Sequence, residues 1–281
     1  MGPKATPIIR DMGGHDRVMI ESGLGIWSVA VPAALFAALA IAESWRPRRQ
    51  LVLGRYPRWF THAIFFAVNA AAGRLLALII IVGSAAAWAE KAQFGLFHMT
   101  SWPWWLEALL AFIIFDFAVW FQHLMMHRFS ILWRIHKVHH SDRDLDASSA
   151  LRFHPFELIL STFYKSAWVA LLGVPLLTAL LFELWLNANA LFNHSNIRLP
   201  GRLDRIIRPF LVTPDMHFVH HSVVISEQNR NFGFALSCWD RIFGTYQAEA
   251  VSGQAQQTVG LAEAQDASPG KAAWSLLLPL R

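Results

Sequence analysis

Long apolar stretches separated by short polar segments fill most of the chain before residue 200. The stretch 24–42 is apolar apart from Ser28. A helix of this length, at ~1.5 Å per residue, crosses the ~30 Å hydrocarbon core of a membrane. Similar stretches lie near 59–89, 104–121 and 158–192, the last interrupted by Gly173-Val174-Pro175. This interruption predicts a turn between two short helices, so the stretch 158–192 is expected to form a hairpin. The pattern predicts an all-α transmembrane bundle with about four to five membrane helices.

Basic residues are distributed unevenly between the polar segments. Residues 46–58 carry five Arg, whereas residues 90–103 carry one basic residue, Lys91. Because basic loops stay in the cytoplasm, the first of these segments is expected inside and the second outside. The segments that follow the third and fourth apolar stretches are also rich in Arg and Lys. They predict a helical cap on the cytoplasmic face of the bundle.

The polar ends of the chain suggest a simple domain organisation. Residues 1–22 contain Asp11, Asp16 and Glu21 and lack the apolar core of a cleavable signal peptide. We expect them to form an N-terminal extramembrane segment, followed by a single membrane-embedded catalytic domain over 23–246. Residues 247–281 are expected to be a C-terminal tail. Its segment 248–268 is polar and rich in Ala, Gln and Gly, and is expected to be flexible.

Composition agrees with a membrane protein and excludes several other classes. Apolar residues make up 55% of the chain and charged residues 15%, against about 25% charged residues in soluble domains. The net charge of +5 does not indicate a nucleic-acid partner, because the Arg residues flank apolar stretches. A single cysteine, Cys238, excludes an internal disulfide and a thiolate metal site.

The candidate chemistry lies in histidines clustered on the predicted cytoplasmic side. Histidines three or four residues apart share one face of a helix, whereas adjacent residues diverge by ~100°. His139 and His140 are therefore expected to bind different ions, which predicts a dimetal site spread over the segments 123–140 and 194–221. The candidate metal ligands are His123, His127, His136, His139, His140, His154, His194, His217, His220 and His221.

Several polar residues near these histidines have candidate supporting roles. Asp116 precedes His123 by two helical turns and is expected to accept a hydrogen bond from a ligand imidazole. Asn187 is interpreted as a helix–helix hydrogen-bonding residue. Asp142 and Asp146 follow a histidine cluster, and both a solvated loop and a role at the site stay open for them.

The identity of the metal is not fixed by histidine alone, since imidazole suits Fe, Zn, Cu and Ni. A membrane zinc hydrolase is the main alternative function, but the HExxH pattern is missing from the sequence. A haem electron carrier would need histidine pairs near the middle of the membrane. A metal transporter would need ligands along a path across it. The histidine clusters are predicted at the edge of the membrane, so they favour neither a haem electron carrier nor a metal transporter.

The sequence resembles the fatty acid hydroxylase/sterol desaturase superfamily, and most closely its bacterial sterol desaturase members. The resemblance covers roughly residues 110–246 and includes all three histidine clusters, which are 123–127, 136–140 and 217–221. The matching segments are Asp116-Phe117, the clusters 123–127 and 136–140, residues 151–157, 193–196, 213–221 and 231–233, and the run Trp239-Asp240-Arg241-Ile242-Phe243-Gly244-Thr245-Tyr246.

This resemblance implies a membrane-bound diiron enzyme with two Fe ions and O2 as co-substrate. It implies hydroxylation or desaturation of an unactivated C–H bond in a lipid, such as a fatty acyl chain, a sterol or a hopanoid. It also implies a bacterial plasma membrane location with the active site on the cytoplasmic side. A separate electron donor (a cytochrome, ferredoxin or flavoprotein reductase) is expected, because the sequence has neither a GxGxxG motif nor a cysteine set. A substrate channel should open toward the membrane.

Overall fold

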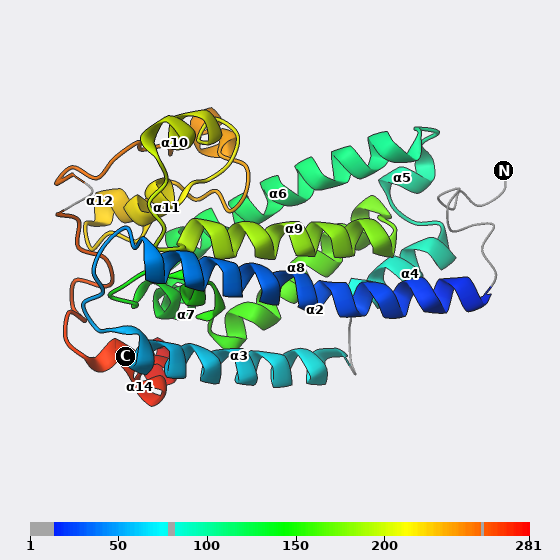
Figure 1. Ribbon diagram of the computed structural model, residues 1–281. Coiled ribbons are helices and arrows are strands. Elements are labelled where there is room, and N and C mark those ends of the chain that lie inside the picture. Colours follow the sequence, from blue (N-terminus) through cyan, green and yellow to red (C-terminus); the bar gives the residue numbers. More distant parts are fainter. Residues whose placement is uncertain (1–13, 78–81, 254–255) are drawn as a thin grey trace.

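The structure is a computed structural model that describes residues 14–77, 82–253 and 256–281 (Figure 1). Most of the expected N-terminal segment, part of the stretch 59–89 and two residues of the expected tail lie outside the described residues. Within the described ranges the regular structure is helical, and β-pairing is limited to isolated bridges. The prediction of an all-α fold is confirmed for this part of the chain.

The longer helices lie side by side and form an elongated bundle (Figure 1). The chain turns at Gly173 between the last two of these helices, in the segment where the sequence predicts a hairpin. The bundle helices are α2 (Gly14–Trp45), α3 (Arg55–Ala77), α6 (Trp104–Arg128), α8 (Pro155–Leu172) and α9 (Leu176–His194).

Two of the described helices, α6 and α9, are long and apolar enough to cross a membrane, and the segment Val29–Trp45 of α2 is a shorter apolar helix. Large apolar side chains also point outward from the bundle, which is typical of a lipid-facing surface. Examples at least two fifths exposed are Trp27, Phe66, Phe121, Phe163 and Leu181.

Short helices gather at one end of the bundle and form the cap (Figure 1). The helices labelled there are α7 (Ser130–His140), α10 (Gly201–Ile207), α11 (Pro214–His220), α12 (Ile225–Gln228) and α14 (Ala272–Leu277). The remaining short elements are α13 (Cys238–Ile242) and the 3-10 helices η1 (Ala147–Leu151), η2 (Ser268–Gly270) and η3 (Leu278–Leu280). Helices α4 (Val82–Ala92) and α5 (Leu96–Met99) lie at the opposite end.

The described part of the expected C-terminal tail is packed against the bundle. Leu261 and Leu278 are buried with Phe65 of α3 in one apolar cluster. The Arg152 Nη2 atom donates to the Pro269 carbonyl at 2.9 Å and to Ser275 Oγ at 2.7 Å. The average composition of the tail is polar and does not indicate these few buried apolar residues. The expectation of flexibility therefore does not hold where they pack.

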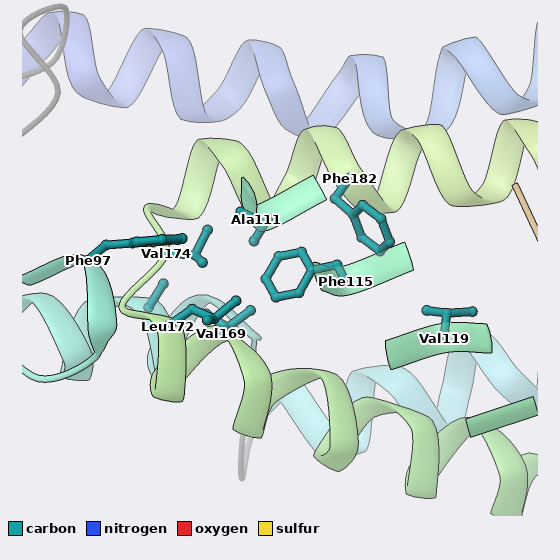
Figure 2. Packing of buried hydrophobic residues seen from close by; sticks show 10 residues of the cluster. Phe97, Ala111, Phe115, Val119, Val169, Leu172, Val174 and Phe182 are labelled. Atoms are coloured by element: carbon teal, nitrogen blue, oxygen red, sulfur yellow. The ribbon is translucent and has the colours of Figure 1, made fainter. Parts of the chain in front are cut away.

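An aromatic core fixes the end of the bundle far from the cap (Figure 2). Phe115 of α6 and Phe182 of α9 pack with their ring centroids 5.1 Å apart. Gly173 has a φ of 69°, and a Cβ atom there would meet the His98 ring at 2.6 Å. Glycine is required because it tolerates both the left-handed conformation and the close approach. This core holds α6, α8 and α9 in register, so their cap-side ends meet.

Candidate metal centre

Nine of the ten predicted metal ligands come together in two groups in the described part of the chain. Within each group, one ligand atom from every residue lies within 4.8 Å of the others. The side chains come from α6, α7, α9 and α11, which the fold brings to one place. Group 1 is His123, His127, His136, His140 and His220, and group 2 is His139, His194, His217 and His221.

Helical spacing explains how the clusters divide between the groups. Histidines four residues apart share a group, as in the pair His136 and His140 and the pair His217 and His221. The histidine between the members of each pair belongs to the other group. Adjacent histidines therefore face different groups, as the ~100° rotation per residue predicts.

The Nε2 atoms in each group converge at distances suited to a shared metal ion. His123 Nε2 lies 3.1 Å from His136 Nε2 and 3.0 Å from His220 Nε2. His194 Nε2 lies 3.0 Å from His139 Nε2 and 2.9 Å from His217 Nε2. Nitrogens that bind one ion at ~2.1 Å lie ~3 Å or slightly more apart, so the spacing fits a shared metal ion.

Unpartnered buried nitrogens in group 1 also fit a metal there. In the described residues, His127 Nε2 and both ring nitrogens of His140 are buried and have no hydrogen-bond partner. Leaving a buried polar atom without a partner costs ~1–3 kcal/mol, and ligation of a cation removes that cost. The donor set is rich in imidazole, which suits Fe, Zn, Cu and Ni.

The opposite ring nitrogen of several ligands is tied to the protein. Each such Nδ1–H donates to an oxygen, so Nε2 keeps the lone pair that faces the centre of the group. The acceptors are the Phe232 carbonyl for His123 (2.7 Å), Glu157 Oε1 for His136 (2.7 Å), the Ala190 carbonyl for His194 (2.7 Å) and the Arg230 carbonyl for His220 (2.8 Å).

Burial keeps the cap histidines in the neutral form that binds metals. Removal from water lowers the pKa of His220 to about 3, although its hydrogen bond to the Arg230 carbonyl acts in the opposite direction. Burial, reinforced by neighbouring imidazoles, also lowers the pKa well below 6.5 for His139, His140, His217 and His221.

The two groups adjoin each other. The rings of His140 in group 1 and His221 in group 2 stack with their centroids 4.3 Å apart. His139 and His140, which are adjacent on α7, have ring centroids 5.5 Å apart. Metal ions held in the two groups would be neighbours, as a dinuclear site requires.

His154, the tenth predicted ligand, lies outside both groups. Its Nε2 atom is 3.2 Å from the Leu276 carbonyl, and its Nδ1 atom accepts a hydrogen bond from the Phe156 amide. His154 therefore caps the start of α8 and ties α8 to the C-terminal segment. The sequence does not reveal this role, because the acceptor on Leu276 lies 122 residues away along the chain.

Asp116 does not support a ligand imidazole, contrary to the prediction. Its carboxylate accepts hydrogen bonds from Trp239 Nε1 at 2.8 Å and from the Leu236 amide. The two-turn spacing places Asp116 on the same face of α6 as His123. The segment 236–239 packs against Asp116 there, so its carboxylate bonds to that segment and not to a ligand imidazole.

The ligand-supporting carboxylates are Glu157 and, indirectly, Asp240. Glu157 binds His136 directly. Asp240 accepts the amide hydrogens of Phe232 and Gly233 at 2.9 and 2.8 Å and so holds the segment whose carbonyl binds His123. Both residues lie in the segments that carry the family resemblance, which is the sequence signal that could have identified them.

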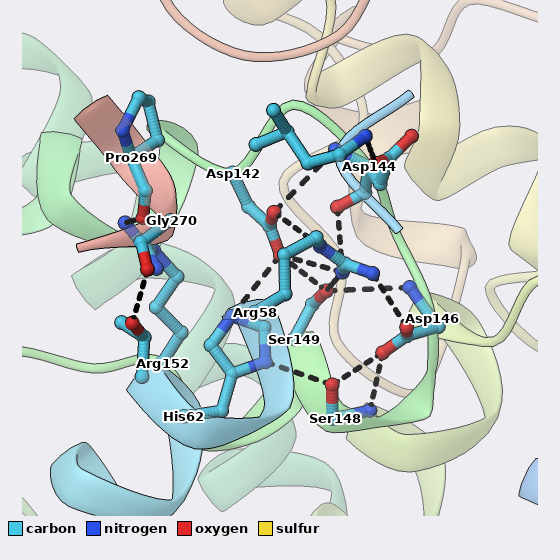
Figure 3. Close-up of polar contacts among 12 residues, drawn as sticks. Arg58, His62, Asp142, Asp144, Asp146, Ser148, Ser149, Arg152, Pro269 and Gly270 are labelled. Atoms are coloured by element: carbon cyan, nitrogen blue, oxygen red, sulfur yellow. Dashed lines mark hydrogen bonds and ion pairs between the residues drawn. The ribbon is translucent and has the colours of Figure 1, made fainter. Parts of the chain in front are cut away.

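A buried polar network fixes the loop that follows α7 (Figure 3). Arg58 of α3 donates to Asp142 at 2.7 and 2.8 Å and to Asp146 at 2.6 Å. His62 lies 2.7 Å from Ser148 Oγ and 3.2 Å from Asp142. Burial acts to raise the pKa of Asp142, but the Arg58 guanidinium outweighs it and holds the pKa well below its usual range. Asp142 and Asp146 are thus structural ion-pair partners of Arg58.

A cavity of about 370 Å³ extends from group 1 into the helical bundle. His123 and His136 lie at its cap end, and apolar side chains such as Phe66 and Leu158 line its walls. The exposed lining residues include Phe66 of α3 and Asn187 of α9. The cavity therefore opens between these two helices, toward the apolar surface of the bundle.

Comparison with known proteins matches residues 108–245 to the model of the fatty acid hydroxylase family. Ornithine lipid hydroxylase OlsE of Rhizobium tropici is 32% identical over 155 residues, which cover 53% of this chain and 44% of the relative. Human alkylglycerol monooxygenase is 30% identical over 167 residues, which cover 58% of this chain and 34% of the relative. Human cholesterol 25-hydroxylase is 31% identical over 147 residues, which cover 51% of this chain and 52% of the relative.

The aligned part of this chain spans about a third to a half of the length of these curated relatives. No solved structure matches the chain significantly. The family match includes all nine clustered histidines, and it confirms the resemblance seen in the sequence. Residues 108–245 of this chain, about half of its length, thus match the fatty acid hydroxylase family.

Proposed function

We propose that this protein is a membrane-bound diiron hydroxylase that inserts oxygen into a C–H bond of a lipid. The named relatives support a lipid substrate, because they are hydroxylases or monooxygenases of ornithine lipids, alkylglycerols and cholesterol. They also favour hydroxylation over desaturation. The proposed location is a bacterial plasma membrane, with four to five membrane helices and the site on the cytoplasmic side.

One observation carries this proposal more than any other. His123 and His136 belong to group 1 and also line the apolar cavity. A lipid chain in the cavity would therefore end beside the metal ligands. The opening between α3 and α9 suits a substrate that enters from the membrane.

The histidines of groups 1 and 2 would each hold one iron. Bound iron would supply the redox chemistry that activates dioxygen. In the overall reaction one oxygen atom enters the C–H bond and the other leaves as water, with two electrons and two protons supplied through a separate electron donor. The protein orients the imidazoles through Glu157 and backbone carbonyls, and its buried cap excludes water from the site.

Adjacent residues of α7 provide the sharpest test, because His139 and His140 belong to different groups. We expect about two irons per chain in the purified protein and about one in either His139→Ala or His140→Ala. The double variant His139→Ala/His220→Ala should lose both. The control His154→Ala should keep both, because His154 lies outside the groups.

Function is then tested with isotopic oxygen. Wild-type protein supplied with ¹⁸O₂, a reductant system and a bacterial lipid extract should yield a lipid heavier by one ¹⁸O atom, and the double variant should not. Zinc in place of iron, with no oxygen consumption after reconstitution with Fe(II), would instead favour the hydrolase alternative. A metal content unchanged in the double variant would rule out both.

A further inference from the structure

An ion pair lies inside the cavity, away from the histidines. Lys165 Nζ of α8 is 2.6 Å from Glu183 Oε1 and 2.8 Å from Oε2 of α9. Both residues fall in the predicted membrane stretch 158–192. Charges placed among membrane helices are expensive and are usually functional. Stability alone does not explain this pair, because its side chains are 22% and 28% exposed and ion pairs that are partly exposed typically add only ~0–1 kcal/mol.

The pair forms the floor of the cavity. Lys165 and Glu183 line the main cavity, and the same two residues line a cavity of about 10 Å³ that continues toward Phe115 and Phe182. The aromatic core closes the bundle beyond that point. An occupant of the main cavity would thus have group 1 at one end and the two opposite charges at the other.

Helix geometry gives the approximate axial separation of two α8 residues that lie near these ends. Lys165 follows Glu157, the partner of His136, by eight residues on α8, which is about 12 Å at 1.5 Å per residue. An extended chain advances ~1.2 Å per bond, so about ten bonds fit between the ends.

The cavity also contains neutral polar atoms between its ends. Gln122 and Ser161 both line it and lie 3.3 Å apart. Asn69 Oδ1 is buried without a hydrogen-bond partner in the described residues, although the Asn69 amide donates to the Phe153 carbonyl. A plain hydrocarbon would leave Asn69 Oδ1 unsatisfied, so the cavity favours an occupant with polar groups of its own.

We propose that the Lys165–Glu183 pair anchors a zwitterionic group of the substrate, with an acid on Lys165 and an amine on Glu183. This inference rests on the proposed lipid hydroxylation and names its substrate class: a lipid with an acid and an amine about ten bonds from the oxidised carbon. A purely anionic lipid would satisfy Lys165 and leave Glu183 as an unpaired charge, which is strongly unfavourable. A zwitterion satisfies both charges, so the pair selects against anionic and neutral lipids.

Binding tests this proposal without turnover. The iron-loaded protein in detergent is titrated with radiolabelled probes of equal acyl length: Nα-hexadecanoyl-lysine, which is zwitterionic, hexadecanoic acid and hexadecanol. We expect the zwitterion to bind at least ~10-fold more tightly than the other two. The variant Lys165→Met/Glu183→Leu should lose this preference and keep its iron.

The charge swap Lys165→Glu/Glu183→Lys separates anchoring from a structural role. It retains an ion pair, so the thermal stability should stay near that of the wild type, while the affinity for the zwitterion should fall. The control Lys91→Met changes an exposed residue of α4 and should bind like the wild type. Equal affinities for the three probes in the wild type, or an unchanged preference in the apolar double variant, would overturn the anchor. Oxygen insertion into any probe is measured separately, so the failure of catalysis is distinguished from the failure of selection.

Discussion

At the scale of single residues, four of the nine clustered histidines have one ring nitrogen facing the centre of a group and the other bonded to the protein. His136 is the ligand whose tether is a carboxylate, since Glu157 accepts its Nδ1–H at 2.7 Å. Such an acceptor fixes the ring orientation and raises the basicity of the opposite nitrogen. Glu157 would therefore act on a bound metal through His136 without touching it.

Replacing this carboxylate should weaken metal binding and preserve the fold. For Glu157→Gln we expect a ~10–100-fold loss of iron affinity, measured by competition with a chelator. The matched control is Asp116→Asn, which neutralises a buried carboxylate that contacts Trp239 and no ligand. An equal loss in both variants would indicate a general structural effect and contradict the tethering role.

At the scale of elements, α7 is the centre of the site because it supplies ligands to both groups. Its position is secured from outside by α3, through Arg58 and the aspartates of the loop that follows α7 (Figure 3). Arg58 is completely buried. The structure thus couples the packing of α3 to the geometry of the metal ligands.

Removing the Arg58 charge should therefore disturb both stability and metal content. Arg58→Met leaves Asp142 and Asp146 buried without their partner, which should cost ~3–5 kcal/mol of unfolding free energy. Thermal unfolding in detergent and iron content should both fall. Arg74→Met, an exposed substitution on the same helix, is the control. An unchanged iron content in a destabilised Arg58→Met protein would show that α7 holds its ligands without the ion pairs of Arg58.

At the scale of the whole molecule, the packed apolar core and the candidate metal site lie at different ends of the bundle. The aromatic core lies at one end, the histidine groups lie at the other, and the cavity runs between them. The C-terminal segment closes the cap over Arg152. Burying many imidazoles in this closed cap also links folding to pH.

The metal-free protein should lose stability as the pH falls below about 6.5. An unfolded histidine takes up a proton near this pH, whereas folded His220 stays neutral until about pH 3. The unfolded state thus binds more protons between these values, and each such histidine contributes up to ~1.4 kcal/mol per pH unit. Stability should change little from this source between pH 7 and 8.

Thermal unfolding in detergent after chelation, followed from pH 8 to pH 5, checks this dependence. His220→Leu should show a shallower decline, because one of the buried imidazoles is gone. A decline of equal slope in the variant would place the titrating groups elsewhere in the chain.

The sequence by itself determined the helical fold, the apolar stretches and the division of adjacent histidines between two groups. These features follow from local periodicity, because the positions 136, 139 and 140 share one helix and its rotation per residue is fixed. The match of residues 108–245 to the family was likewise visible in the sequence.

Only the tertiary structure decided which polar residues support the site. His154 and Asp116 have suitable spacing in the sequence. In the fold, however, His154 bonds to the Leu276 carbonyl, and Asp116 accepts a hydrogen bond from Trp239. Glu157 reaches His136 because α8 packs beside α7. The C-terminal segment, polar on average, is held by a few buried apolar side chains. Contacts between segments far apart in the chain have no local periodicity, so the sequence pattern cannot specify them.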